Sequence, residues 1–461
     1  MESVKAKKEN PLGMAPLGGL LVKFAVPSII SMLVSALYNI VDQIFIGQGV
    51  GLYGNAATNV AFPLTTLATA VGLLIGIGGA SNFNLEMGKK NEDTAKHIAG
   101  SAFGSLIITG LVIALLSRIF LRPLITAFGA TPDVMDYAVT YVGITAIGMP
   151  FFVLTTGGSH LVRADGKPMF SMLAALSGAI INTILDPLFI FVFDWGIAGA
   201  AWATVIGQIF SAVLILGYLP HFHTVSLTWE DYIPKLHYVR MIAALGAAAC
   251  FNQLAIFVTQ ITMNNVLRHY GALSIYGSDI PLAVVGVGSK VNMVFMAIVI
   301  GISQGAQPII GYNYGAANYH RVKKTYRIAA AAATAIAVIA FAGFQLFPRQ
   351  ITALFGSGDE LYEQFAVSYF RIFMFMTFLN GIQPLTSNFF TSIGKATLGI
   401  FISMTRQILF LIPLVLILPL IFGIEGVMFA GPVADGVAGV LAIVLVMREF
   451  KKIPDQNPET V

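Results

Sequence analysis

The sequence predicts an all-α membrane protein of twelve transmembrane helices, arranged as two pseudo-twofold-related six-helix bundles. Its composition, the length of its apolar segments and an internal repeat lead to this prediction. Of 461 residues, 57% are hydrophobic and only 10% are charged, a balance that a water-soluble domain does not have. The apolar segments are much longer than the strands of a membrane barrel, so they predict helices, which satisfy their own backbone hydrogen bonds in lipid.

The apolar segments fall into two groups of six. The first group predicts an N-terminal lobe at 17–219 and the second a C-terminal lobe at 238–447, joined by a polar linker at 220–237. Tails at 1–16 and 448–461 flank them. The expected spans are approximately 17–47, 56–83, 98–120, 134–160, 168–193 and 197–219, then 238–268, 280–310, 322–347, 361–389, 397–422 and 425–447.

Positive charge is unequally divided between alternate loops. About nineteen Lys and Arg residues lie in the tails and in the loops of one side, while the other side has about four: Arg118, Arg122, Arg268 and Arg349. The positive-inside rule therefore places both termini in the cytoplasm. It also accounts for the net charge of +4 without a nucleic-acid partner. The N-terminal tail lacks a small-residue cleavage site, so we expect the first apolar segment to remain as an anchor.

An internal repeat relates the two groups at a displacement of about 227 residues. Several loops share it, which makes chance matching improbable. The matching segments are Gly88-Lys89-Lys90-Asn91 with Gly315-Ala316-Ala317-Asn318, Ile125-Thr126-Ala127 with Ile351-Thr352-Ala353, Ala138-Val139-Thr140-Tyr141 with Ala366-Val367-Ser368-Tyr369, Gly166-Lys167 with Gly394-Lys395, and Gly196-Ile197-Ala198-Gly199 with Gly423-Ile424-Glu425-Gly426. Because each half has an even number of spans, the repeat is parallel, an arrangement found in transporters whose lobes rock about a central site.

Four polar residues lie deep in the first six spans. Asp42 is late in the first span, Asn182 and Asp186 are one helical turn apart late in the fifth, and Thr204 is early in the sixth. The predicted orientation brings all four to the outer half of the bilayer, where they supply oxygen ligands for an alkali cation such as Na⁺. Because neighbouring carboxylates repel each other, the set can also hold a proton. A structural hydrogen bond between helices is the alternative.

The repeat offers a comparison for this set. The same displacement leads from these four residues to positions near Val266–His269, Phe410, Pro413 or Leu414, and Gly431, which include no acid. We therefore expect buried negative charge in the first half alone. Pro27 precedes Asp42 in the first span and predicts a kink, either linked to the charge of Asp42 or passive.

A substrate cavity is predicted from polar, methionine and aromatic residues within the spans, since methionine and aromatic side chains adapt to varied ligands. Ordinary helix packing, or snorkelling for the lysine, is the alternative for each. The candidates are Met149, Phe152, Gln253, Gln260, Asn264, Lys290, Met293, Met296, Gln304, Gln307 and Gln383.

Motifs for other energy sources and for catalysis do not occur. Gly166-Lys167 and Gly394-Lys395 lack the upstream glycine and the Ser or Thr of a phosphate-binding loop. There is no H-E-x-x-H segment and no nucleophile elbow, and the single Cys250 builds neither a disulfide framework nor a metal site. These features favour a gradient-driven carrier over an enzyme, and they predict no cofactor.

These residues make the chain similar to the MATE family, the multidrug and toxic compound extrusion antiporters. The resemblance covers nearly the whole chain. It rests on the two six-helix lobes, the segment from Pro27 to Asp42 that ends in Asp42-Gln43-Ile44-Phe45-Ile46-Gly47, and the set of Asn182, Asp186 and Thr204. In prokaryotic members these positions form a cation site in the N-terminal lobe. Some members have a further acid in helix seven or ten, where this chain has Gln253 and Asn380.

The resemblance implies an antiporter that exports small, often cationic, organic compounds in exchange for Na⁺ or H⁺. It implies a multi-pass monomer in a bacterial or archaeal inner membrane. A lipid-linked precursor flippase of the same superfamily is the first alternative, although such proteins commonly have extra helices and several lumenal arginines. A channel or a membrane-embedded enzyme is the second.

Overall fold

The computed structural model describes residues 10–355 and 360–454, and within these ranges it contains helices and no β-strand. Eleven of these helices are long and apolar enough to cross a membrane. A twelfth span is formed by a pair of helices, Glu360–Ile372 and Thr377–Ser392, that meet at an angle of 42°. The predicted fold class of a twelve-span, all-α membrane protein is confirmed.

We call the helices before the linker the N-terminal lobe and those after it the C-terminal lobe. A short helix α1 (Pro11–Met14) precedes both. The N-terminal lobe contains α2 (Leu17–Gly49), α3 (Leu52–Gly88), α4 (Glu92–Ile119), α5 (Leu121–Ala127), α6 (Pro132–Ala164), α7 (Pro168–Pro187), the π-helix η1 (Leu188–Val192) and α8 (Gly196–Tyr218).

The C-terminal lobe repeats this order with more interruptions. It contains α9 (Leu236–Ala272), α10 (Asp279–Gly315), α11 (Tyr319–Leu346), α12 (Pro348–Ala353), α13 (Glu360–Ile372), the 3₁₀-helix η4 (Thr377–Leu379), α14 (Ile382–Ser392), α15 (Ala396–Met404), the π-helix η5 (Thr405–Leu411), α16 (Ile412–Phe422) and α17 (Ile424–Lys452). The predicted single span at 361–389 is therefore broken after Ile372, and a regular α-helix resumes at Ile382. Pro384 lies in the first turn of this helix, where its missing backbone N–H leaves no helical hydrogen bond unmade.

The repeat is visible in the backbone. Gly166 and Gly394, which the repeat aligns, both adopt positive φ, at 88° and 83°. Glycine reaches this conformation without strain from a side chain. Each lies in the turn before a span that begins at Pro168 or Ala396, so the same turn was kept in both halves.

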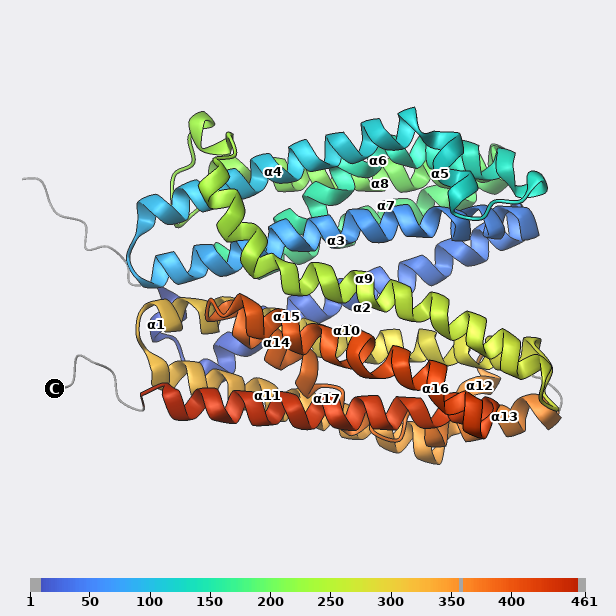
Figure 1. The fold of residues 1–461 in the computed structure, drawn as a ribbon. Helices are drawn as coiled ribbons and strands as arrows, with labels where there is room; N and C mark the ends of the chain where they lie inside the picture. The colour runs from blue at the N-terminus through green and yellow to red at the C-terminus, as the bar shows by residue number, and fades with distance from the viewer. Residues whose placement is uncertain (1–9, 356–359, 455–461) are drawn as a thin grey trace, which may run out of the picture.

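The first helix of each half is shared between the lobes. Figure 1 shows α2 and α9 crossing the space between two groups of helices, and α2 packs against α10 while α9 packs against α3. The beginning of α2, including Leu20 and Phe24, belongs to a buried cluster with helices of the C-terminal lobe, whereas Ile46 packs with Ile190 of the N-terminal lobe. A movement of α2 therefore affects both lobes.

The two lobes are in backbone contact at one end of the molecule. We call this the terminal end, because α1 and the last described residues lie there, opposite α5 and α12 (Figure 1). A Cβ placed on Gly246 of α9 would lie 1.7 Å from the carbonyl oxygen of Leu74 in α3. A Cβ on Gly88 would lie 2.1 Å from that of Tyr312 in α10. Because glycine has no side chain, it permits this close approach of membrane helices. The two lobes are therefore in contact at the terminal end.

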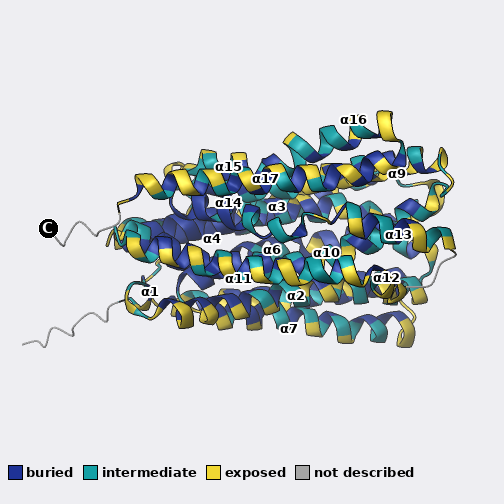
Figure 2. Ribbon diagram, turned by 90° about the horizontal axis from the view of Figure 1, so that it is seen from below, coloured by how far each residue is buried: buried dark blue, intermediate teal, exposed yellow. Residues whose placement is uncertain are grey.

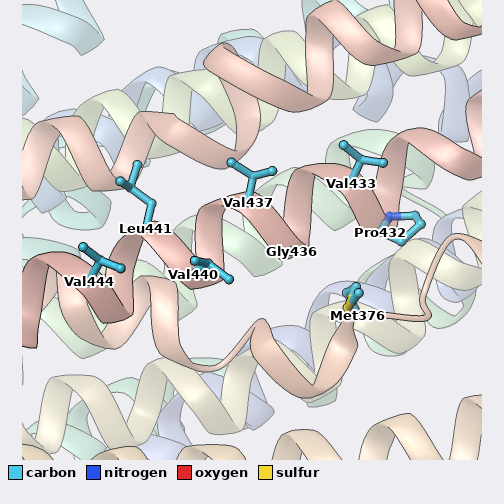
Figure 3. Close-up of a pocket in the computed structure, with 8 residues that line it drawn as sticks. All are labelled: Met376, Pro432, Val433, Gly436, Val437, Val440, Leu441 and Val444. Atoms are coloured by element: carbon cyan, nitrogen blue, oxygen red, sulfur yellow. The ribbon is translucent and has the colours of Figure 1, made fainter.

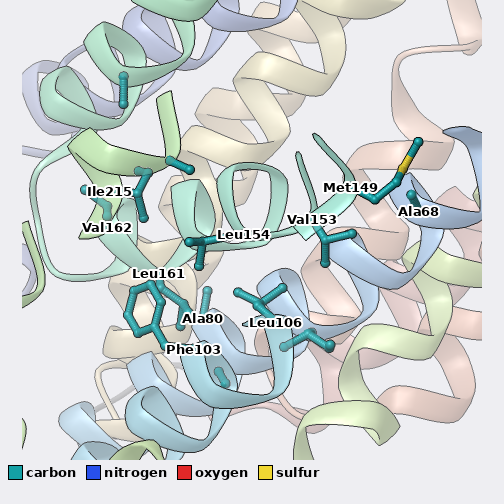
Figure 4. Close-up of a cluster of buried hydrophobic side chains, with 14 of the residues drawn as sticks. Ala68, Ala80, Phe103, Leu106, Met149, Val153, Leu154, Leu161, Val162 and Ile215 are labelled. Atoms are coloured by element: carbon teal, nitrogen blue, oxygen red, sulfur yellow. The ribbon is translucent and has the colours of Figure 1, made fainter. Parts of the chain in front are cut away.

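The interior of the N-terminal lobe is filled by apolar side chains from α3, α4, α6 and α8 (Figure 4). Exposed positions gather on the outer surfaces of the helices (Figure 2). Large apolar side chains are common among them, such as Leu115 and Leu420, which are 60% and 73% exposed. Such a surface suits lipid and not water.

The linker is fixed to the N-terminal lobe. Its 3₁₀-helix η3 (Trp229–Tyr232) lies on α4, where Asp231 is buried and accepts hydrogen bonds from the backbone N–H and hydroxyl of Thr228, each at 2.7 Å. Lys96 and His97 of α4 approach the same carboxylate at 3.2 and 2.9 Å. Burial opposes its ionisation, but the Thr228 hydrogen bonds and the Lys96 charge hold the pKa of Asp231 below its usual value.

Candidate cation site

The structure brings together the four residues predicted to bind a cation. Asp42 of α2, Asn182 and Asp186 of α7 and Thr204 of α8 meet in the half of the N-terminal lobe away from the terminal end. The side chains of Asp42 and Asp186 interact directly. The amide of Asn182 lies 3.3 Å from Asp186 Oδ1 and 3.2 Å from Thr204 Oγ1. Asp42, Asn182 and Asp186 are all buried.

Close packing of α7 and α8 makes this meeting possible. A Cβ on Gly207 of α8 would lie 2.6 Å from the carbonyl oxygen of Gly178 in α7 and 3.3 Å from Cβ of Asn182. With glycine at both positions the two backbones touch, and the side chain of Asn182 reaches Thr204. Just beyond Asp186, α7 ends in the π-helix η1; π segments are frequent at functional sites.

The orientation of the Asn182 amide determines which of its atoms, the oxygen or the nitrogen, faces Asp186 and which faces Thr204. With its nitrogen toward Asp186 Oδ2 at 3.2 Å, its oxygen accepts from the hydroxyl and the backbone N–H of Thr204, each at 3.2 Å. This arrangement satisfies both ends of the amide. Oδ1 of Asp42 is buried and has no hydrogen-bond partner among the described residues, so this oxygen can accept a proton or coordinate a cation.

No positive side chain compensates these carboxylates within the described ranges. The ion pairs there include neither Asp42 nor Asp186. There is also no group of three or more His, Cys, Asp or Glu in those ranges that could hold a metal. The four side chains provide two carboxylates, an amide and a hydroxyl, which are hard oxygen donors suited to an alkali cation and equally able to hold a proton.

Two tyrosines beside the carboxylates were not predicted. Tyr38 is one helical turn before Asp42 on α2, and Tyr141 of α6 lies beside Thr204; both interact electrostatically with the two acids. The sequence contains signals for both. Tyr38 has the i, i+4 spacing that puts it on the same helix face as Asp42, and Tyr141 is in a repeated segment.

Pro27 lies within α2, which runs as one helix from Leu17 to Gly49. The hydroxyl of Ser31 donates to the carbonyl oxygen of Pro27 at 2.9 Å. Next to it, α2 packs tightly on α10, since a Cβ on Gly305 would lie 2.5 Å from Cα of Ala25. The proline therefore lies where α2 meets the C-terminal lobe.

The predicted cavity residues separate into buried and accessible groups. Met149 is part of the apolar core, Gln307 donates to Ser81 Oγ at 2.8 Å, Gln383 donates to the Ile402 carbonyl at 2.6 Å, and Gln304 is also buried. These four lie in helix packing. The others are exposed or half-buried: Phe152, Gln253, Gln260, Asn264, Lys290, Met293 and Met296.

An apolar hollow of about 560 Å³ lies on the C-terminal lobe. Figure 3 shows the residues that line it. It is lined by Met376 and by one face of α17 that includes Pro432, Val437 and Val444. None of the predicted cavity residues is among its lining residues. It lacks the polar side chains that orient a ligand in a binding site.

The expectation of buried negative charge in the first half alone is wrong. Asp435 of α17 is 2% exposed. It pairs with Arg406, and its Oδ2 accepts a hydrogen bond from Asn380 at 2.9 Å. The displaced positions missed it because Asp435 lies one helical turn beyond Gly431, the position that corresponds to Thr204.

The fold and this site define a duplicated twelve-span membrane protein with buried carboxylates in each lobe. A family model described as MatE matches residues 27–188 and 248–417. The chain therefore belongs to the MATE family, as its resemblance predicted.

Individual relatives agree with this assignment. The multidrug export protein MepA of Staphylococcus haemolyticus is 26% identical over 427 residues, which are 92% of each chain. MepA of Staphylococcus aureus strain MSSA476 is 25% identical over 433 residues, 94% of each. A solved structure described as the outward-facing conformation of a multidrug resistance MATE family transporter has a TM-score of 0.89 and 22% identity, and the match covers 97% of this chain and 99% of that one.

Proposed function

We propose that this chain is a secondary antiporter that exports small, often cationic, organic compounds in exchange for Na⁺ or H⁺. The observation that supports it most is the interacting pair Asp42 and Asp186, buried without a basic partner in the described chain. Uncompensated carboxylates at membrane depth are costly and mark ion pathways. Multidrug export relatives support the substrate class.

The coupling acts through α2 in this proposal. Its first part, with Phe24, packs in the core of the C-terminal lobe, while Asp42 near its other end faces α7. A cation or proton at Asp42 and Asp186 removes their repulsion and draws the two helices together. An organic substrate would have to favour the opposite arrangement, since a ligand shifts an equilibrium only through unequal affinity for its states.

The membrane arrangement follows from the charge bias. In this proposal the terminal end is cytoplasmic, so the glycine contacts of Gly88 and Gly246 close the cytoplasmic side. Substrate is then released toward the outer side. The accessible candidates, from Phe152 to Met296, then line the central path for substrate. The chain works as a monomer in a prokaryotic cell membrane, with two lobes at 17–219 and 238–447 and without catalysis or a cofactor.

Reconstituted transport tests this proposal. Purified protein in proteoliposomes is loaded with a fluorescent organic cation, and sodium and proton gradients are imposed separately. Efflux that follows one gradient and stops when that gradient is collapsed is the expected result. Efflux independent of both gradients contradicts ion-coupled antiport, and movement of lipid-linked sugars in place of the organic cation would favour the flippase.

A further inference from the structure

A second buried polar site lies in the C-terminal lobe, away from the residues discussed for coupling. The carboxylate of Asp435 accepts from Arg406 Nε through Oδ1 and from Asn380 Nδ2 through Oδ2. Its side chain is 2% exposed, and that of Arg406 is 19% exposed. Asp435 thus has a fixed positive partner on one oxygen and an amide donor on the other.

Irregular backbone brings these three residues together. Arg406 lies in the π-helix η5, and Asn380 directly follows η4 in the broken tenth span. α17 approaches this break closely, because a Cβ on Gly431 would lie 2.5 Å from the carbonyl oxygen of Phe373. Non-helical backbone at membrane depth is tolerated where it is buried in protein, and here it surrounds the ion pair.

The repeat relates this site to the cation site of the N-terminal lobe. Tyr141 and Tyr369 are aligned by the same displacement. Tyr141 interacts with Asp42 and Asp186, and Tyr369 interacts with Arg406 and Asp435. Each lobe therefore places its copy of this tyrosine beside its buried carboxylate group, but the partner of the carboxylate differs.

We propose that the guanidinium of Arg406 is a resident cation, which neutralises Asp435 and keeps the C-terminal lobe from taking a coupling ion. Arginine stays protonated in proteins and forms a directional pair with a carboxylate. Asp435 consequently requires no ion from solution, and the number of Na⁺ or H⁺ ions moved per cycle is set by Asp42 and Asp186. This inference rests on the proposed antiport, and it specifies which lobe binds the ion.

The test counts ions bound by purified protein, using ²²Na⁺ binding and proton uptake by the full chain in detergent. Asp435→Asn is expected to keep the wild-type count, because its charge was already neutralised. Arg406→Gln is expected to add one ion, because it leaves Asp435 unpaired, and Arg406→Gln with Asp435→Asn should return to the wild-type count.

Several results overturn the inference. Loss of a bound ion in Asp435→Asn would make Asp435 a coupling site, and an unchanged count in folded Arg406→Gln would make the pair a structural link alone. If Arg406→Gln does not fold by itself, adding Na⁺ or lowering the pH should restore its folding, because an ion then takes the place of the guanidinium. Failure of both conditions to restore folding overturns the inference. Asp186→Asn is measured in parallel: an unchanged count there contradicts the proposed cation site in the N-terminal lobe, independently of the result for Asp435.

Discussion

The two lobes share a fold but bury negative charge in different ways. In the N-terminal lobe Asp42 and Asp186 meet without a basic partner in the described chain, and one oxygen of Asp42 has no hydrogen-bond partner there. In the C-terminal lobe Asp435 has Arg406 and Asn380. In the proposed antiport the first arrangement takes an ion from solution, whereas the second already has a positive partner within the protein. A duplicated scaffold can therefore keep its architecture while the partner of its buried carboxylates changes from one copy to the other.

The largest expected effect comes from removing charge in the cation site of the N-terminal lobe, which we call the open site because its carboxylates have no basic partner in the described chain. Asp186→Asn, and separately Asp42→Asn, should reduce gradient-driven efflux to the level of empty vesicles, because each variant loses an ionic ligand with little change in volume. Membrane insertion and thermal stability should be close to those of the wild type. The measurement is proteoliposome efflux under an imposed gradient.

The matched control for these variants is Asp194→Asn. Asp194 is exposed and adopts a positive φ of 56°, a conformation that asparagine also tolerates. Its substitution removes the same charge outside the site, and efflux should be unchanged. Wild-type efflux in both Asp42→Asn and Asp186→Asn would show that the open site does not couple transport.

A smaller effect is expected where the lobes touch. Gly246→Ala places a methyl group 1.7 Å from the carbonyl oxygen of Leu74, so α9 must move from α3. Overpacking of this kind costs about 1–3 kcal/mol, and the temperature of unfolding should fall. Gly217→Ala on α8 is the control, because nothing lies within 4 Å of its added Cβ. Equal unfolding temperatures for the two variants would contradict close contact of the lobes at the terminal end.

The contrast between the lobes shows which features of the fold and of the buried sites could be predicted from the sequence. Apolar length and the repeat predicted twelve spans, and the i, i+4 spacing of Asn182 and Asp186 predicted one face of α7. Local periodicity contains that information. Asp435 was visible as an acid in an apolar span, but its pairing with Arg406 and Asn380 depends on the π-helix η5 and on the break between Ile372 and Ile382. These irregularities change the direction of side chains in ways that a regular helical period does not describe.

The glutamines show the same limit for the cavity. Polar residues inside spans, such as Gln304, Gln307 and Gln383, are typical of a binding surface. Two of these amides instead donate hydrogen bonds to neighbouring helices: Gln307 to Ser81 and Gln383 to Ile402. The side chain of a polar residue inside a span forms its hydrogen bonds either with a ligand or with another helix. Sequence alone does not distinguish these, because the choice depends on which helix lies opposite.

The smallest expected effect separates the two repeated tyrosines. Tyr141→Phe removes a hydroxyl that lies beside Thr204 and within hydrogen-bonding reach of it, next to the cation site of the N-terminal lobe. A neutral hydrogen bond contributes about 0.5–1.5 kcal/mol, so the concentration of Na⁺ or H⁺ that half-saturates efflux should change by roughly two- to tenfold. Tyr369→Phe is the matched change beside the paired site, and it should leave ion dependence as in the wild type. Equal shifts in the two variants would mean that both lobes contribute to ion binding, and that the pairing of Asp435 with Arg406 does not isolate the C-terminal lobe from the coupling ion.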